Sequence, residues 1–174
     1  MERMHTTPSR RSSSRTGMKG IVSSLSMGES GILAAGTFSR WVGLYDSGGR
    51  GETIAVFPLV SPSSTTTTSN AKDTEQQGTG ITQLLWSPCS RYLCTVERGS
   101  DGICVWDVRV TGKELAWLVG RNARTNQRLG IDLIGDEIWA GGTDGKVRVW
   151  NGVGTKEGVV KARFEFLAHD GEPW

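Results

Sequence analysis

The chain has 174 residues, of which 36% are hydrophobic and 22% charged, and its formal net charge is +2. This length is typical of one domain, and the hydrophobic and glycine content is ordinary for a folded β protein, so a sizeable core is possible. No apolar run approaches the ~18 residues that span a bilayer, and three cysteines without a signal peptide indicate reduced thiols, so we expect a soluble intracellular protein.

The first segment, residues 1–19, is rich in Ser, Thr and Arg and carries most of the basic excess. Its five basic residues against Glu2 give a balance of +4, which leaves −2 for the rest of the chain. The segment has no hydrophobic periodicity, so it is predicted to be a disordered basic tail. It is interpreted either as a solvated tail or as a nuclear-import or phosphorylatable arm near an RNA.

Residues 20–60 contain short apolar runs separated by polar turns. The runs 21–26, 32–36, 41–45 and 53–59 are predicted strands. The following run, 61–79 (SPSSTTTTSNAKDTEQQGT), is polar throughout and has no apolar anchor, so it is predicted to be a disordered insertion. Filler between repeats is one interpretation of this insertion, and a phosphorylated docking loop is the other.

The same order of strands and turns recurs in residues 80–119 and 128–168. The predicted strands are 81–86, 92–96, 103–106 and 114–118 in the second copy, and 131–134, 138–141, 146–150 and 160–167 in the third. The third strand of each copy closes on an aromatic residue, Tyr45, Trp106 or Trp150. These residues are 61 and 44 positions apart, and only the first interval contains the insertion. The underlying period is therefore the roughly 40–45 residues of a four-stranded propeller blade.

The chain is accordingly predicted to be all-β, a partial WD40-type β-propeller of about three four-stranded blades, with the start of a fourth at residues 170–174. Known propellers close with roughly 4–8 blades, so we expect missing blades or another chain to complete the ring. The positions that support such blades structurally are predicted to be Tyr45, Asp46, Asp101, Trp106, Asp107, Asp144 and Trp150.

Blade geometry predicts a basic rim at one end of the ring, because the turn between the second and third strands opens at the same end as the connection to the next blade. This end collects the basic residues Arg40, Arg98, Arg121, Arg124, Arg128 and Lys146. Such a cluster is suited to phosphates, although Asp–Arg pairs between turns are also ordinary structural devices. Residues 119–128 (VGRNARTNQR) are predicted to form an ordered loop. Trp41 is interpreted either as core or as a stacking platform for a base.

Catalysis and metal binding have little support in the sequence. The two histidines are His5 and His169, which lie near the two ends of the chain, so no Ser/His/Asp or Cys/His site can be assembled on the blades. Cys89 and Cys94 lack further ligands at zinc-finger spacing and are interpreted as small packing residues. We expect no enzyme activity, no metal and no cofactor, unless the missing blades carry catalytic groups.

Several segments carry a closer resemblance: RTGMKGIVSSL, LAAGTFSRWVGLYD, GITQLLWSP and KELAWLVGRNARTNQRLGIDL. They resemble the C-terminal propeller half of the telomerase Cajal body protein family, including its fungal relatives. The most specific part is Gly120-Arg121, followed by Thr125-Asn126-Gln127-Arg128 and Asp132. The resemblance implies a nuclear scaffold for small nuclear and Cajal-body-type guide RNAs, including telomerase RNA in animals, with a link to splicing in fungi.

These observations together predict a non-enzymatic WD-repeat scaffold that binds small nuclear or guide-type RNA and ribonucleoprotein proteins in the nucleus, with the cytoplasm as a second location. The residues expected to contact RNA are Arg40, Trp41, Arg98, Arg121, Arg124, Asn126 and Arg128. The alternative is a general protein-interaction propeller in which the same rim binds acidic peptides.

Overall fold

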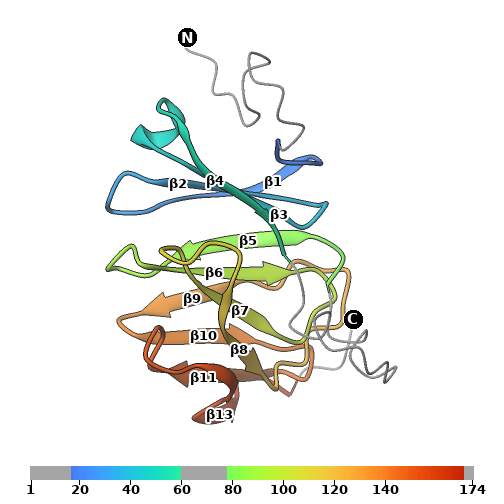
Figure 1. Cartoon of the computed structure of the whole chain (residues 1–174). Coiled ribbons are helices and arrows are strands. Elements are labelled where there is room, and N and C mark those ends of the chain that lie inside the picture. The colour runs from blue at the N-terminus through green and yellow to red at the C-terminus, as the bar shows by residue number, and fades with distance from the viewer. Residues whose placement is uncertain (1–16, 60–77, 171–174) are drawn as a thin grey trace, which may run out of the picture.

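The computed structural model describes residues 17–59 and 78–170, and in this part of the chain nearly all regular structure is β-strand. The strands form three sheets that lie one after another along the molecule (Figure 1). The predicted all-β, partial-propeller fold is confirmed. The predicted basic tail (except residues 17–19), nearly all of the insertion and the start of a fourth blade (except Asp170) lie outside the described residues.

The first sheet is an antiparallel meander in the order β1-β2-β3-β4. Its strands are β1 (Val22–Met27), β2 (Leu33–Thr37), β3 (Trp41–Tyr45) and β4 (Thr53–Pro58). A short 3-10 turn, η1 (Ser47–Gly49), follows β3, and its reversal uses positive φ angles at Gly48 and Gly49 of 64° and 84°. The side chain of Asp46 caps this turn by accepting a hydrogen bond from the Ser47 backbone N–H at 2.6 Å.

The second sheet repeats the meander with β5 (Ile81–Trp86), β6 (Tyr92–Glu97), β7 (Ile103–Asp107) and β8 (Glu114–Val119). Its strand boundaries agree with the sequence prediction to within one residue at each end, because each strand is a compact run of Val, Ile, Leu and aromatic residues between polar turns. Asp107 lies at the end of β7 and pairs with Arg109 at 2.6 Å.

The third sheet contains β9 (Ile131–Ile134), β10 (Glu137–Gly141), β11 (Lys146–Asn151) and β13 (Phe164–Leu167), in the order β13-β11-β10-β9. The prediction of one fourth strand over 160–167 is wrong. The segment divides in two: β13 pairs antiparallel with β11, whereas β12 (Gly158–Lys161) pairs parallel with β8 and becomes the fifth strand of the second sheet. The added strand covers backbone groups along the outer edge of β8.

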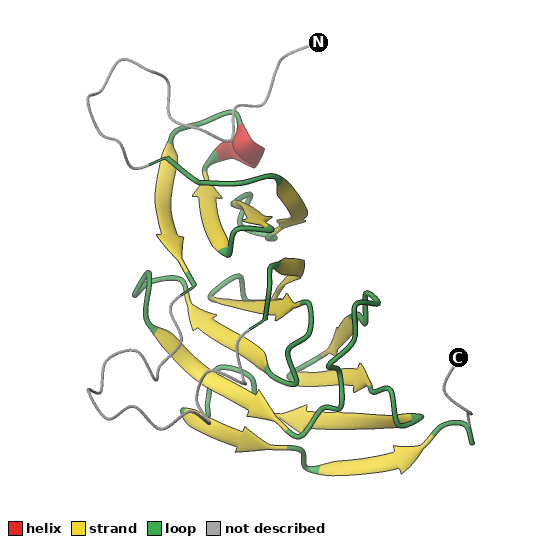
Figure 2. Ribbon diagram, turned by 90° about the vertical axis from the view of Figure 1, so that its right-hand side faces the viewer, coloured by secondary structure: helices red, strands yellow, loops and turns green. Residues whose placement is uncertain are grey.

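Apolar residues between neighbouring sheets form the core. One cluster fills the seam between the first and second sheets and contains Val42, Leu44, Ile81, Leu93 and Trp106. Another fills the seam between the second and third sheets and contains Val96, Ile103, Leu118, Ile138 and Trp150. The view in Figure 2 shows the three sheets following one another from one end of the molecule to the other.

The closing aromatics are all buried. The predicted place of Trp106 and Trp150 between adjacent blades is confirmed, since each belongs to one of the two seam clusters. The Trp106 indole Nε1 donates to Thr95 Oγ1 at 3.1 Å, and the Trp150 Nε1 donates to the Val119 carbonyl at 3.2 Å. Tyr45 is buried on the other face of the first sheet, beside Leu33 and Met18. Across residues 17–59 and 78–170, no helix has the length and apolar character needed to cross a membrane.

Candidate functional site

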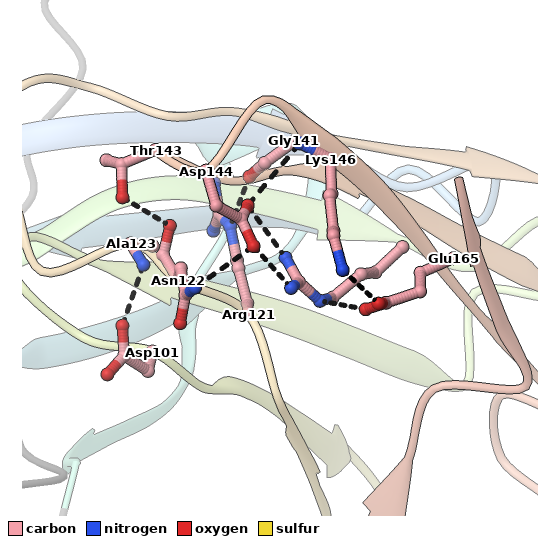
Figure 3. Close-up of polar contacts among 10 residues, drawn as sticks. Asp101, Arg121, Asn122, Ala123, Gly141, Thr143, Asp144, Lys146 and Glu165 are labelled. Carbon is pink, nitrogen blue, oxygen red and sulfur yellow. Dashed lines mark hydrogen bonds and ion pairs between the residues drawn. The ribbon is translucent and has the colours of Figure 1, made fainter. Parts of the chain in front are cut away.

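The connection between β8 and β9, residues 120–130, is a loop anchored by Arg121. This side chain is 1% exposed. Its Nε donates to the Gly141 carbonyl at 3.0 Å (Figure 3). Its Nη2 donates to the Gly130 carbonyl at 3.3 Å. Burial lowers the pKa of the Arg121 guanidinium to about 10, so it remains protonated at neutral pH. The guanidinium of Arg121, which was expected to contact RNA, is thus enclosed in the structure and holds the two ends of the loop against the third sheet.

Asp101 ties the 120–130 loop to the turn between β6 and β7. Its Oδ1 accepts a hydrogen bond from the Ala123 backbone N–H at 2.7 Å, and its Oδ2 lies 2.6 Å from the Arg124 Nε. The Arg124 side chain is nevertheless 53% exposed. Asp101 therefore connects this turn to the loop and orients the Arg124 side chain.

Asp144 ties the loop to the turn between β10 and β11. Its carboxylate accepts hydrogen bonds from the Asn122 side-chain amide at 3.0 Å and from two Arg148 nitrogens at 3.1 and 2.6 Å. The Thr143 backbone N–H also donates to the Asn122 carbonyl, at 2.7 Å. The hydrogen bonds from Arg148 are the main cause that lowers the pKa of Asp144 to about 2. Figure 3 shows how these contacts continue through Glu165, which pairs with both Arg148 and Lys146.

A pocket of about 200 Å³ lies beside the anchored loop. Its wall includes the Trp117 side chain from β8 together with Asp101, Asn122 and Arg124. The sequence analysis did not name Trp117 as a site residue, and in the structure this side chain also packs against the cluster in the first seam. The signal that could have pointed to Trp117 is its position two residues before the end of the strand that leads into the basic loop. The pocket thus combines an aromatic side chain with polar and basic groups.

The rest of the loop presents its side chains to solvent. Asn126, Gln127 and Arg128 are exposed, and the backbone turns at Thr125, whose N–H donates to the Ala123 carbonyl at 2.8 Å. Among the salt bridges within the described residues, none involves Arg128. Three of the predicted RNA contacts, namely Arg124, Asn126 and Arg128, are therefore accessible on one loop.

The other predicted contacts lie at the seam between the first and second sheets. Arg40 pairs with the buried carboxylate of Glu97 at 2.6 Å, which gives it a structural role at this seam. The Arg98 guanidinium lies 5.5 Å from the centre of the Phe38 ring. Lys19 lies 5.7 Å from the centre of the Trp41 ring, and Trp41 is only partly exposed. The seven predicted residues are thus divided between the two seams.

The side chains around the loop are of kinds that can bind a ligand. Within residues 17–59 and 78–170, no three His, Cys, Asp or Glu side chains gather in a way that could hold a metal ion. The free thiols of Cys94 and Cys104 are buried, and burial raises the pKa of both. The loop surface instead offers guanidinium groups, side-chain amides and an aromatic wall, which can bind an anionic or planar ligand.

Comparison with known proteins identifies several relatives, although no protein-family model matches the chain. It is 36% identical over 136 residues to guanine nucleotide-binding protein negative regulator 1 of Schizosaccharomyces pombe. It is 32% identical over 127 residues to telomerase Cajal body protein 1 of Homo sapiens, and 32% identical over 126 residues to the Mus musculus protein. These names describe a regulator and a component of a nuclear body, so a scaffold or interaction role fits them.

The matches cover most of this chain but a minor part of the relatives. They include 76% of the chain and 30% of the yeast protein, and 71% of the chain and 22% of the human protein. Among solved structures, the chain resembles the computationally designed proteins Ika8 and Ika4, with TM-scores of 0.56 and 0.58 at 15% identity. The alignments cover 90% and 91% of this chain and 39% and 80% of the designed chains, and they concern the fold alone.

Proposed function

Since the chain is homologous to telomerase Cajal body protein 1 and to a fission-yeast negative regulator over 71% and 76% of its length, we propose that it is a non-enzymatic scaffold that binds RNA in a nuclear ribonucleoprotein. The Cajal body in the name of the mammalian relatives supports the nuclear setting. The RNA contact itself is proposed from the 120–130 loop.

The observation that carries the proposal is the anchoring of this loop on both sides. Asp101 holds it to the second sheet, while Arg121 and Asp144 hold it to the third. A loop that is ordered before binding loses less conformational entropy when a ligand arrives. Arg124 and Arg128 are thereby presented to solvent from a defined backbone, as contacts with successive phosphates require.

The adjoining pocket supports an RNA ligand over a simple anion. Its wall includes the Trp117 ring beside Asn122 and Arg124. Single-stranded RNA is recognised by stacking of unpaired bases on aromatic side chains and by hydrogen bonds to base edges. We assign the aromatic wall to an unpaired base and the Asn122 amide to its edge, with Arg124 and Arg128 on the flanking phosphates.

The ion pair between Arg124 and Asp101 is compatible with this role. The Arg124 side chain is about half exposed, and exposed ion pairs contribute only about 0.2–1 kcal/mol. A phosphate can therefore share or replace Asp101 at small cost. Arg40 and Arg121, which pack in the structure, are left out of the proposed contact set, and Arg98 and Trp41 would belong to a second contact area at the neighbouring seam.

A binding experiment tests the proposal with the whole chain and a short fluorescent single-stranded RNA. The double variant Arg124→Ala/Arg128→Ala should bind about 10-fold or more weakly, and the slope of log affinity against log salt should fall by about 1.4, because each lost phosphate contact removes roughly 0.7. The matched control is Arg50→Ala/Arg91→Ala, which removes two exposed arginines from turns at the opposite end of the strands. The control should bind RNA as the unchanged chain does.

Two outcomes would contradict the proposal. One is an equal loss of RNA affinity in the double variant and in its control, because that result describes unspecific charge attraction. The other is that the unchanged chain does not bind the RNA but binds a poly-glutamate peptide through Arg124 and Arg128. That outcome would support the alternative of a protein-interaction propeller with a preference for acidic segments.

A further inference from the structure

The turn between β2 and β3 presents an aromatic side chain to solvent beside the turn between β6 and β7. Phe38, on the first of these turns, is 44% exposed. The guanidinium carbon of Arg98, on the second turn, lies 5.5 Å from the centre of the Phe38 ring. We call Phe38 and Arg98 the seam pair, because they lie on either side of the seam between the first and second sheets. They place an aromatic ring and a positive charge side by side.

The backbone that carries the seam pair is fixed from both sheets. The Arg98 N–H donates to the Gly80 carbonyl at 2.9 Å. Gly80 also lies directly against the Phe38 backbone, since a Cβ at this position would be 2.6 Å from the Phe38 carbonyl oxygen. Arg40, in the same turn as Phe38, has a φ angle of 61°, and its pairing with Glu97 holds this rarely adopted conformation. Both side chains of the pair therefore project from a backbone that is ordered before a ligand arrives.

The Arg98 guanidinium differs from two other arginines of the rim in lacking a carboxylate partner. Arg40 pairs with Glu97 and Arg124 pairs with Asp101, both at 2.6 Å. Within the described residues, no ion pair includes Arg98, and its Nε is buried without an acceptor. A buried donor without an acceptor is costly, and a phosphate supplies the oxygen acceptors that the fold does not. The structure thus leaves a positive charge at this seam available to an anion.

The turn between β6 and β7 connects the seam pair to the pocket beside Trp117. Arg98 is the first residue of this turn, and Asp101 and Gly102 at its other end line the pocket. Gly102 packs directly against the Trp117 indole, which occupies the space that a Cβ would take. The turn therefore has an aromatic side chain at each end, Trp117 beside Gly102 and Phe38 beside Arg98.

We propose that the seam pair is a second subsite for the RNA strand, in which an unpaired base stacks on the Phe38 ring and the Arg98 guanidinium binds the adjoining phosphate. Aromatic rings stack with bases of any sequence, and guanidinium groups bind phosphate oxygens through charge-assisted hydrogen bonds. The strand runs from the Trp117 pocket across the turn between β6 and β7 to the seam pair. This inference rests on the proposed function and deepens it, because it assigns one strand to two aromatic subsites.

RNA binding by the whole chain tests the second subsite, with a fluorescent single-stranded RNA of about 12 nucleotides. Phe38→Leu keeps the apolar volume but removes the ring, so it should weaken binding about 10-fold and leave the slope of log affinity against log salt unchanged. Arg98→Gln should weaken binding and lower that slope by about 0.7. Phe38→Tyr keeps an aromatic ring and should bind as the unchanged chain does. The matched control is Phe166→Leu, at a phenylalanine that is also 44% exposed but lies on the third sheet, and it should not change the affinity.

Two further measurements separate a contact with RNA from structural support of the seam. The same RNA with 5-iodouracil bases should form a photocrosslink to Phe38 in the unchanged chain. Arg98→Gln should melt at the temperature of the unchanged chain, because the Arg98 Nε has no protein acceptor to lose. A lower melting temperature of this variant together with an unchanged RNA affinity would show that the seam pair only supports the fold.

The outcomes for the two subsites can be told apart. If Arg124→Ala/Arg128→Ala weakens RNA binding while Phe38→Leu and Arg98→Gln bind normally, the second subsite is wrong and the proposed function stands. If the unchanged chain binds no RNA, or instead binds a poly-glutamate peptide through Arg98, both proposals are wrong.

Discussion

At the residue scale, the arginines of the predicted rim divide into two groups that the structure separates by burial. Arg40 and Arg121 face protein acceptors: the former pairs with the buried Glu97 carboxylate and the latter donates to two backbone carbonyls. Arg128 is exposed, and Arg124 pairs with Asp101 while about half of its side chain remains exposed. The same residue type therefore stabilises the loop at one position and is available to a ligand at another.

Replacement of Arg121 by Ala is expected to lower the free energy of unfolding by about 2–4 kcal/mol. The change leaves the Gly141 and Gly130 carbonyls without their donor and empties the space of a large buried side chain. Arg128→Ala on the same loop is the control and should change stability by less than about 0.5 kcal/mol. Urea denaturation of the two variants measures the difference. Equal stability of both would show that Arg121 does not anchor the loop.

Asp144 gives a prediction with a defined pH dependence. Its pKa is about 2 in the folded chain because Arg148 donates to its carboxylate, below the value of about 4 expected when unfolded. A lowered folded-state pKa contributes stability that is complete above about pH 4 and is lost as the pH falls toward 2. Allowing for the partial exposure of this carboxyl, the contribution is on the order of 1–2 kcal/mol.

Urea denaturation of the unchanged chain and of Asp144→Asn near pH 6 and near pH 3 tests this assignment. Near pH 6 the unchanged chain should have a higher free energy of unfolding than Asp144→Asn. Near pH 3 this difference between the two proteins should be smaller, because the Asp144 carboxylate is titrated and Asn is not. Asp136→Asn, at an exposed position between β9 and β10, is the control and should show a smaller change in that difference. A difference that is independent of pH would contradict the role of the Asp144 carboxylate.

At the element scale, the feature that departs most from a regular blade is β12, which leaves the third sheet and pairs with β8 of the second. The strand has two unlike sides: Val160 is 8% exposed and packs in the seam, whereas Val159 is 71% exposed. The chain passes from β11 in the third sheet to β12 in the second through Gly152 and Gly154, whose φ angles of 74° and 85° lie in a region that favours glycine. β12 therefore links the two sheets through backbone pairing as well as through the core.

The two neighbouring valines of β12 supply a matched pair of substitutions. Val160→Asp places a carboxylate in the apolar seam and should destabilise the chain by at least about 3 kcal/mol, whereas Val159→Asp should have an effect within about 1 kcal/mol. Thermal unfolding followed by circular dichroism measures both. If both substitutions have the same effect, β12 is not packed against β8 in solution.

At the scale of the whole molecule, the three sheets form a short linear array in which consecutive sheets pack against each other through two apolar seams. Gln83 on β5 bridges the second seam: its Oε1 accepts from the Ile131 backbone N–H at 2.8 Å, and its Nε2 donates to the Ile131 carbonyl at 2.9 Å. In the first seam, Ser24 on β1 receives the Leu84 backbone N–H at 2.9 Å. In both seams, a polar side chain on the first strand of one sheet thus forms hydrogen bonds with the backbone of the first strand of the following sheet.

Loss of the Gln83 bridge should loosen the third sheet more than the other two, because stability in such arrays is approximately a sum of the sheets and their seams. For Gln83→Ala, native-state hydrogen exchange of the amides in β9 and β10 should become about 10-fold faster or more, whereas amides of β2 and β3 should change little. Gln127→Ala, at an exposed position, is the control. Uniformly faster exchange across all three sheets would instead indicate one cooperative unit.

The sequence by itself determined the fold class, the three repeats and nearly every strand, because alternating apolar residues, turn glycines and the spacing of Tyr45, Trp106 and Trp150 are local signals. It also indicated that the turns and the 120–130 loop gather at one end. The hydrogen bonds of Asp101 and Asp144 to that loop agree with this arrangement.

Only the tertiary structure decided which strands pair across sheets and which arginines are enclosed. Residues 158–161 have the composition of an ordinary fourth strand, and their parallel pairing with β8 depends on an edge more than 40 residues away in sequence. Arg121 and Arg128 look alike in the sequence, but two carbonyls brought together by folding surround only Arg121. Burial and hydrogen-bond partners are properties of contacts between distant segments, so a single sequence cannot specify them.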